Sequence, residues 1–151
     1  MIYRKATLHD AEAIYVLVNE YANKGMMLNR ARSQLYENIR DFIVAEDQGE
    51  IIGAGALHVM WVDLAEVRTL AVHPKYIRQG IGKRIVELLL EQGVALGVKK
   101  AFTLTYQPEF FAACGFKEED KNCMPQKVWT DCINCPKFPN CDEICMSRPI
   151  V

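Results

Sequence analysis

The sequence predicts a single α/β domain with a mixed β-sheet, and three observations support this fold class. Strand-like apolar runs alternate with helix-like amphipathic stretches along most of the chain. The chain has 151 residues, 50% of them hydrophobic, which suffices for one core. An apolar run at 67–72 leads through a turn with two glycines directly into an amphipathic helix. We therefore expect one domain over residues 1–151, without repeats or linkers.

The first half of the chain predicts a strand, a long helix, a short helix and a hairpin. Thr7 with Asp10 three residues later is a weak capping box, which predicts a helix start. Ser33 is a candidate cap for the short helix. Gly53 and Gly55 lower strand propensity and indicate a bend or a close approach of the backbone. The predicted elements are a strand at 2–4, a helix that ends at 23–25, a helix at 35–39, and strands at 42–46 and 51–60.

The second half predicts two strands that alternate with two helices. Pro108 opens the last helix and Gly115 ends it, in keeping with the preference for proline first and glycine last. After Phe116 the pattern fades, apart from a short run at 127–129. The predicted elements are a strand at 65–72, a helix at 82–93, a strand at 101–106 and a helix at 108–114.

Charge and hydropathy exclude some classes of partner. The chain has 18 basic and 19 acidic residues, and its net charge of −1 argues against nucleic acid, which is usually met by a basic face. No apolar run approaches the ~20 residues of a membrane span. The first residues lack the apolar region of a signal peptide. We therefore expect a cytoplasmic protein that binds neither nucleic acid nor a membrane.

The turn between the predicted strand and helix has the composition of a phosphate-binding site. Gly80 and Gly82 allow the backbone to approach a ligand closely. The start of the helix presents N–H groups and a partial positive charge, worth ~0.3–1 kcal/mol per anionic contact. Arg78 and Lys83 add full charges. This segment predicts a site for a pyrophosphate.

The order of elements and the motifs resemble the GNAT N-acetyltransferase superfamily. IRQGIG, at 77–82, is similar to its acetyl-CoA loop, Arg/Gln-x-x-Gly-x-Gly/Ala, although Ile77 stands where Arg or Gln is usual. TLAVHP resembles the strand that pairs with the pantetheine arm, and FFAACGF resembles the F-Y-x-x-x-G-F element beside coenzyme A. The resemblance covers about residues 1–118. It implies a mostly antiparallel central sheet flanked by helices, with 119–151 as a Cys-rich C-terminal extension.

The same resemblance implies which residues contact acetyl-CoA, the expected cosubstrate. They come from the central strand, the glycine turn and the late helix. The expected contacts are Leu70, Ala71, Val72, Arg78, Gln79, Gly80, Ile81, Gly82, Lys83 and Phe111.

Four segments together look like the short, single-domain bacterial N-acetylglutamate synthases of arginine biosynthesis. They are LNRARSQLYENIRDFIVAE, EVRTLAVHP, FTLTYQPEFFAACGF and KVWTDCINCPKFPNCDE. The resemblance implies acetyl transfer to the α-amine of L-glutamate. Another amino acid, a small amine or a protein amine stays open as the acceptor. A non-catalytic coenzyme-binding module, a zinc or thiol regulator, and a homodimer also stay open.

Acetyl transfer needs a base, because an ammonium group has no lone pair, and a donor for the oxyanion. Glu66 is the candidate base; the alternative is a strand-start acid that only pairs with Arg68. The resemblance implies that the backbone N–H of Leu70 or Val72 is the oxyanion donor. Many relatives use a tyrosine where this chain has Phe111. Thr105 and Tyr106 are therefore the candidates for protonating the leaving thiolate, unless it leaves unassisted.

Two carboxylates on the acceptor call for cationic side chains, and arginine binds a carboxylate in a bidentate way. Arg30 stands at the arginine position of the family's Leu-Pro-Arg-Ser loop, and Arg32 could share its role. Arg68 and Lys127 are further candidates. The alternative for each is a solvated surface charge.

The last cysteines follow the spacing C-x2-C-x5-C-x3-C, at Cys132, Cys135, Cys141 and Cys145. Four thiolates would satisfy a tetrahedral zinc ion. The synthase-like relatives commonly have the first three cysteines without the fourth, so zinc is not expected here. A disulfide or simple packing of small thiols is the alternative.

Overall fold

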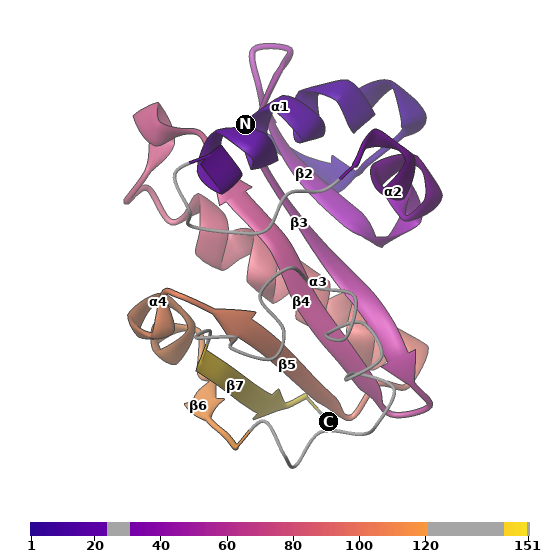
Figure 1. Cartoon of the computed structure of the whole chain (residues 1–151), viewed down its shortest axis with the longest axis vertical. Helices are drawn as coiled ribbons and strands as arrows, with labels where there is room; N and C mark the ends of the chain where they lie inside the picture. Colours follow the sequence, from indigo (N-terminus) through magenta and orange to yellow (C-terminus); the bar gives the residue numbers. More distant parts are fainter. Residues whose placement is uncertain (24–30, 121–143, 151) are drawn as a thin grey trace.

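The computed structural model describes residues 1–23, 31–120 and 144–150, which form helices around one sheet (Figure 1). Within these ranges the sheet has seven strands in the order β1-β2-β3-β4-β5-β7-β6. Only β4 and β5 run parallel; every other neighbouring pair is antiparallel. The predicted mixed, mostly antiparallel sheet is therefore confirmed. The strands are β1 (Ile2–Lys5), β2 (Phe42–Asp47), β3 (Glu50–Trp61), β4 (Leu64–Val72), β5 (Lys100–Thr105), β6 (Lys117–Glu118) and β7 (Ile144–Pro149).

Helices cover both faces of this sheet. Ile43 and Ala45 of β2 pack in one core with Ile85 of α3, whereas Val44 packs in a second core with Ile14 of α1. Successive side chains of a strand point to opposite faces, so β2 is buried on both sides. The helices are α1 (Ala11–Asn23), α2 (Arg32–Glu37), α3 (Ile81–Leu96) and α4 (Pro108–Ala113), with 3-10 turns η1 (Leu8–Asp10), η2 (Ile39–Asp41) and η3 (Pro74–Tyr76).

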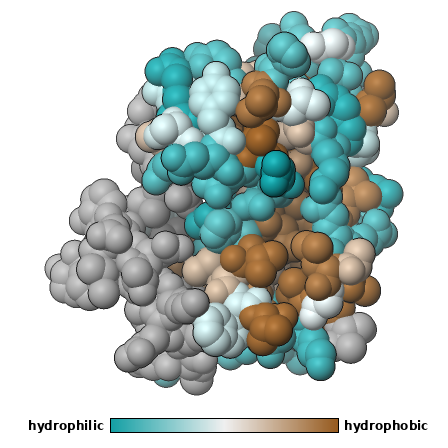
Figure 2. All heavy atoms as spheres, turned by 90° about the vertical axis from the view of Figure 1, so that its right-hand side faces the viewer, coloured by the Kyte–Doolittle hydropathy of each residue, from teal (hydrophilic) through white to brown (hydrophobic). Residues whose placement is uncertain are grey.

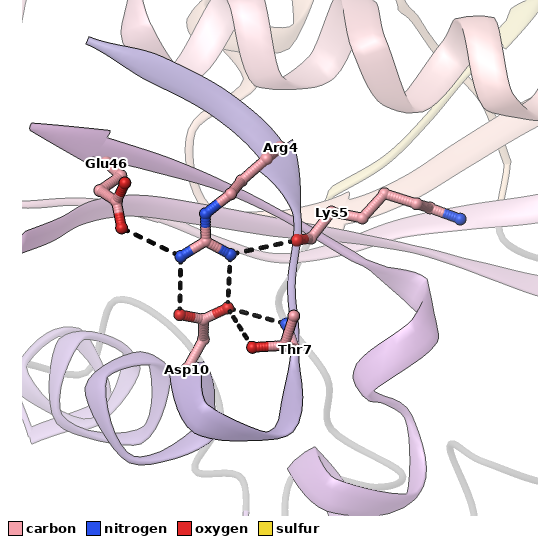
Figure 3. A network of polar contacts seen from close by, with 5 residues as sticks. All are labelled: Arg4, Lys5, Thr7, Asp10 and Glu46. Atoms are coloured by element: carbon pink, nitrogen blue, oxygen red, sulfur yellow. Dashed lines mark hydrogen bonds and ion pairs between the residues drawn. The ribbon is translucent and has the colours of Figure 1, made fainter. Parts of the chain in front are cut away.

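The start of α1 depends on the carboxylate of Asp10, as the Thr7–Asp10 spacing predicts. Asp10 accepts hydrogen bonds from the Thr7 backbone N–H at 2.7 Å and from the Thr7 hydroxyl at 3.2 Å. Arg4 donates to both Asp10 oxygens, at 2.7 and 2.9 Å, and to Glu46 at 3.1 Å (Figure 3). These contacts, led by the Arg4 hydrogen bonds, lower the pKa of Asp10 to about 2. Through Arg4, the buried carboxylate of Asp10 thus links β1 and β2 to η1, the turn that leads into α1.

The predicted close approach at the glycines of β3 is confirmed. A Cβ on Gly55 would lie 2.9 Å from Cγ2 of Ile85 and 2.9 Å from Cδ1 of Leu70, so only glycine lets α3 pack this close. Ala54 pairs with Ala71 and Ala56 with Arg68, which leaves two β4 residues opposite Gly55. This is a β-bulge, and its first residue, Thr69, has a φ of 58°.

Three features differ from the sequence-based predictions. The short helix begins at Arg32 after Ala31, whose N–H donates to the Gln34 side chain at 3.1 Å, so Ser33 is not its cap. α3 continues three residues beyond Gly93, because the left-handed residue that ends it is Gly97. β7, inserted between β5 and β6, falls where the sequence pattern fades.

Large exposed apolar side chains lie at the C-terminal end of α3. Val94 and Leu96 are exposed in the last turns of that helix. Figure 2 shows hydrophobic side chains grouped over the lower part of one face.

No helix in the described ranges combines the length and apolar character that a bilayer span requires.

Candidate functional site

β4 and β5 separate after three residue pairs. Leu64 pairs with Lys100, Ala65 with Ala101, and Glu66 with Phe102. Both strands continue beyond this point, to Val72 and to Thr105, without further pairing between them (Figure 1). Their ends therefore diverge, and the edge of β4 from 67 to 72 has no described strand beside it on that side. We call the region between 67–72 of β4 and 103–105 of β5 the splay.

The main chain of Val72 faces this splay. The N–H of His73 donates to the carbonyl of Ile52 on β3 at 2.7 Å. Neighbouring residues of a strand direct their polar groups to opposite sides, so the N–H and C=O of Val72 point away from β3. The Tyr21 hydroxyl of α1 donates to the Val72 carbonyl. Burial raises the pKa of Tyr21.

The glycine turn forms the start of α3. Gly80 is its N-cap, with a φ of 79°, and Arg78 has a φ of 67°. The N–H of Arg84 donates to the carbonyl of Gly80 at 3.0 Å, which is the first bond of the helix. The N–H groups of Ile81, Gly82 and Lys83 precede that bond and have no partner within the helix. With the positive end of the helix dipole, they form a cradle for an anion.

α4 packs beside this cradle through Phe110. A Cβ on Gly82 would lie 3.2 Å from Cζ of Phe110, so glycine fits where the ring crosses the turn. Phe111, the expected coenzyme contact, is buried and packs edge-to-face against Phe110 and Phe116 at ring-centre distances of 5.1 and 5.3 Å. The aromatic ring that meets the cradle is therefore that of Phe110, which the motif comparison did not single out.

Glu66 lies where the splay begins, at the last pair with β5. Its side chain is 13% exposed, and its Oε1 lies 3.6 Å from Nη1 of Arg68. The ion pair that the alternative interpretation predicts is thus present. Glu66 is the third residue of β4, because the strand begins at Leu64 rather than at Ala65.

His58 and Asp41 form a second polar pair beside Glu66. His58 of β3 stands directly opposite Glu66 in the antiparallel register, so both side chains leave the same face of the sheet. Its Nδ1 lies 2.7 Å from Oδ2 of Asp41. This pair could not be predicted from the sequence, because only the β3–β4 register brings His58 next to Glu66.

The two candidate proton donors follow each other at the end of β5. The Thr105 hydroxyl accepts a hydrogen bond from the backbone N–H of Gln107 at 2.8 Å and is buried. Phe102 shares a face with Glu66, and Thr105 lies three residues further, so Thr105 points to the opposite face. Glu66 and Thr105 therefore lie on the two strands that border the splay, and their side chains point to opposite faces of the sheet. Tyr106 is half-buried immediately after the strand.

Several candidates lie outside the described residues, and one arginine is engaged elsewhere. Arg32 donates from Nε and Nη2 to Glu12 at 2.9 and 3.0 Å and lies over the Tyr15 ring, at 3.9 Å from its centre. The candidates outside the described residues are Arg30, Lys127, Cys132, Cys135 and Cys141.

Cys145, the fourth cysteine of the spacing pattern, lies in β7. It is 2% exposed and clusters with Leu64 and Phe102. Within 1–23, 31–120 and 144–150, no three His, Cys, Asp or Glu side chains are grouped in a way that could hold a metal ion.

Residues 9–119 match the model of the Acetyltransferase (GNAT) family. An uncharacterized N-acetyltransferase of Chlorobaculum tepidum is 43% identical over 147 residues, which are 97% of this chain and 95% of the relative. An amino-acid acetyltransferase of Mycobacterium tuberculosis is 38% identical over 152 residues, which are 99% of this chain and 80% of the relative.

Two solved structures share the fold. A Mycobacterium tuberculosis protein in complex with CoA and NLQ superposes with a TM-score of 0.88 at 34% identity, over the full length of both chains. The N-acetylglutamate synthase of Neisseria gonorrhoeae, in complex with coenzyme A and N-acetyl-glutamate, superposes with a TM-score of 0.91 at 24% identity. This chain covers 35% of that longer protein. At this identity the second likeness shows the fold alone.

Proposed function

The chain belongs to the acetyltransferase (GNAT) family, and we propose that it transfers acetyl from acetyl-CoA to the α-amine of an amino acid, most simply L-glutamate. This reaction is the first step of arginine biosynthesis. The observation that carries the proposal is the adjacency of two features. An anion cradle begins α3, and the splay of β4 and β5 opens beside the strand that leads into it.

The residues of the cradle fit the diphosphate of the cosubstrate. The N–H groups of Ile81, Gly82 and Lys83 donate to its oxygens, and the Arg78 and Lys83 side chains neutralise its charge. The main chain of Val72 lines the splay, where a peptide-like pantetheine arm can pair with it. Bound there, the thioester presents its carbonyl to the edge of β4.

The side chains around the splay carry the proton transfers. Glu66 takes a proton from the ammonium group, directly or through water, and the amine nitrogen then forms its bond to the acetyl carbon. The N–H of Leu70 or Val72 donates to the carbonyl oxygen as it becomes an oxyanion. The carbon–sulfur bond then breaks, and Thr105 or Tyr106 protonates the thiolate. The nitrogen gives up its second proton at this stage, directly or through water, and this proton replaces the one that the hydroxyl donated.

An amino acid as the acceptor is supported by similarity and by charge. The Mycobacterium tuberculosis relative, at 38% identity, is named an amino-acid acetyltransferase. Arg68 lies next to Glu66, on the same face of β4, where it can meet a carboxylate while the amine meets the base. Arg30 and Lys127 are the further candidates for the two carboxylates of glutamate.

The test is release of the coenzyme thiol from acetyl-CoA with each of the twenty amino acids as acceptor. We expect glutamate to give the highest kcat/KM. A higher value for another amino acid would reassign the acceptor. Binding of acetyl-CoA without turnover of any acceptor, including small amines and peptide N-termini, would favour a non-catalytic coenzyme-binding module.

A further inference from the structure

An open pocket of about 400 Å³ lies beside the cradle, between α3, the end of α4 and β7. Lys83 and Glu87 line it from α3, Cys114 and Gly115 from the end of α4, and Arg148 from β7. Lys83 is also the third residue of α3, so its backbone belongs to the cradle and its side chain to the pocket wall. The pocket therefore adjoins the cradle.

Arg148 is held in place by the turn that follows α4. Its Nη1 donates to the carbonyl of Cys114 at 2.7 Å. Gly115 has a φ of 88°, and a Cβ there would lie 3.3 Å from the guanidinium carbon, so the guanidinium lies against the bare backbone. A guanidinium has five N–H donors in one plane, and one hydrogen bond to a carbonyl leaves a fork that suits a phosphate.

The charges of the pocket favour an anion. Lys83 and Arg148 are cationic, and the carboxylate of Glu87 lies 3.3 Å from Nη1 of Arg84, which offsets part of its charge. Burial raises the pKa of the Cys114 thiol and Glu87 adds to the rise, whereas Lys83 and Arg148 oppose it. Both cations therefore act on the same small volume.

We propose that this pocket binds the 3′-phosphorylated ribose of the coenzyme, with Lys83 and Arg148 as the cations that contact its 3′-phosphate. The inference rests on the proposed function, which places the coenzyme diphosphate at the N–H groups of Ile81–Lys83. In coenzyme A, one ribose separates the diphosphate from the 3′-phosphate. A ligand whose diphosphate occupies the cradle carries its second anionic group to the neighbouring pocket.

The experiment measures the dissociation constants of coenzyme A and of 3′-dephospho-coenzyme A by calorimetry, without acceptor. For the unaltered protein we expect the dephospho form to bind at least about tenfold more weakly, since a charge-assisted pair is worth roughly 1.5–3 kcal/mol. Arg148→Met should reduce this ratio to about two or less, and Arg148→Lys should restore part of it. Arg40→Met, at an exposed position of η2 outside the pocket lining, removes one cation elsewhere and should leave the ratio unchanged.

The ratio of the two dissociation constants shows whether Arg148 contacts the 3′-phosphate or only stabilises the turn after α4. If Arg148 only holds the turn after α4, Arg148→Met weakens both ligands equally and keeps the ratio, which would overturn its assignment. Equal affinities of the unaltered protein for the two ligands would overturn the whole inference. Failure of the protein to bind either ligand would instead refute the proposed function.

Discussion

Glu66 of β4 stands opposite Phe102 of β5 in the last pair of the parallel ladder, and the two strands diverge from there. Phe102 is fully buried, whereas the Glu66 side chain keeps 13% of its surface exposed. Where the two strands diverge, β5 thus contributes a buried phenyl ring and β4 a partly exposed carboxylate.

Replacing Glu66 with glutamine should slow acetyl transfer by about a hundredfold, the usual contribution of a general base. The loss should be largest at low pH, because an α-amine with a reference pKa of ~8 is then almost entirely protonated. The measurement is kcat/KM for the acceptor across the pH range, with the coenzyme dissociation constant as a check on folding. Glu91→Gln, at an exposed position of α3, is the control. Turnover like that of the unaltered protein at every pH would remove Glu66 from the mechanism.

Thr105 and Tyr106 can be separated by single substitutions. The Thr105 oxygen accepts the N–H of Gln107, which leaves its own O–H proton to donate. If Thr105 protonates the thiolate, Thr105→Val should lower kcat at least about tenfold, Thr105→Ser should retain activity, and Tyr106→Phe should have little effect. The reverse pattern would assign the role to Tyr106. Unchanged kcat in all three variants would mean that the thiolate leaves unassisted.

Arg30→Ala should raise KM for glutamate at least about tenfold, because it removes a charge-assisted contact to a carboxylate. KM for acetyl-CoA should stay within about twofold. Arg32→Ala should have a smaller effect on glutamate, because Arg32 is bound to Glu12 and lies over Tyr15. Arg40→Ala, at an exposed position of η2, is the control for the loss of one positive charge. An unchanged KM for glutamate in Arg30→Ala would exclude Arg30 from the acceptor site.

The sequence predicts the features of this site that depend on local chemistry. The cradle follows from Gly80 and Gly82, since a left-handed N-cap favours glycine and a Cβ on Gly82 would lie only 3.2 Å from Cζ of Phe110. The start of η1, which leads into α1, follows from the spacing of Thr7 and Asp10. The ends of β1 to β5 fall within one residue of prediction, because apolar runs and turn residues mark them.

Features that depend on distant partners could not be predicted from the sequence. β7 contains Ser147 and Arg148 within six residues, and it becomes a strand because β5 and β6 pair with it on both sides. The bulge at Thr69 follows from the β3–β4 register, and a β-branched residue at a φ of 58° is not predicted by propensity. The position of Cys145 in the sequence matches the spacing of metal-binding cysteines. The pairing of β7 with β5, however, places its side chain beside the apolar side chains of Leu64 and Phe102.

Asp10 should make the fold sensitive to acid. The Arg4 hydrogen bonds lower the pKa of Asp10 from its ordinary value of 3.8 to about 2, so its ionised form stabilises the fold above about pH 4. This contribution, about 2 kcal/mol, should be lost as the pH falls from about 4 to 2. Urea unfolding across this range should show the loss in the unaltered protein and a flatter profile in Asp10→Asn. Glu12→Gln, which breaks an exposed ion pair, is the control. An equally steep profile in Asp10→Asn would contradict the assignment.

Gly55→Ala should both destabilise the fold and weaken coenzyme binding. The added methyl group would lie 2.9 Å from Ile85 Cγ2 and 2.9 Å from Leu70 Cδ1, and overpacking of this kind costs typically about 1–3 kcal/mol. Leu70 belongs to the bulge that borders the splay, so its displacement moves the edge of β4 at which we propose that the coenzyme binds.

A double-mutant cycle with Leu70→Ala measures this contact in urea unfolding. Because the smaller side chain makes room for the methyl group, the double variant should be less destabilised than the sum of the single variants, by about 1 kcal/mol. Additive effects would mean that the strain falls on Ile85 and α3. In that case coenzyme binding should weaken through the cradle at Ile81–Lys83, and Leu70→Ala should not restore it.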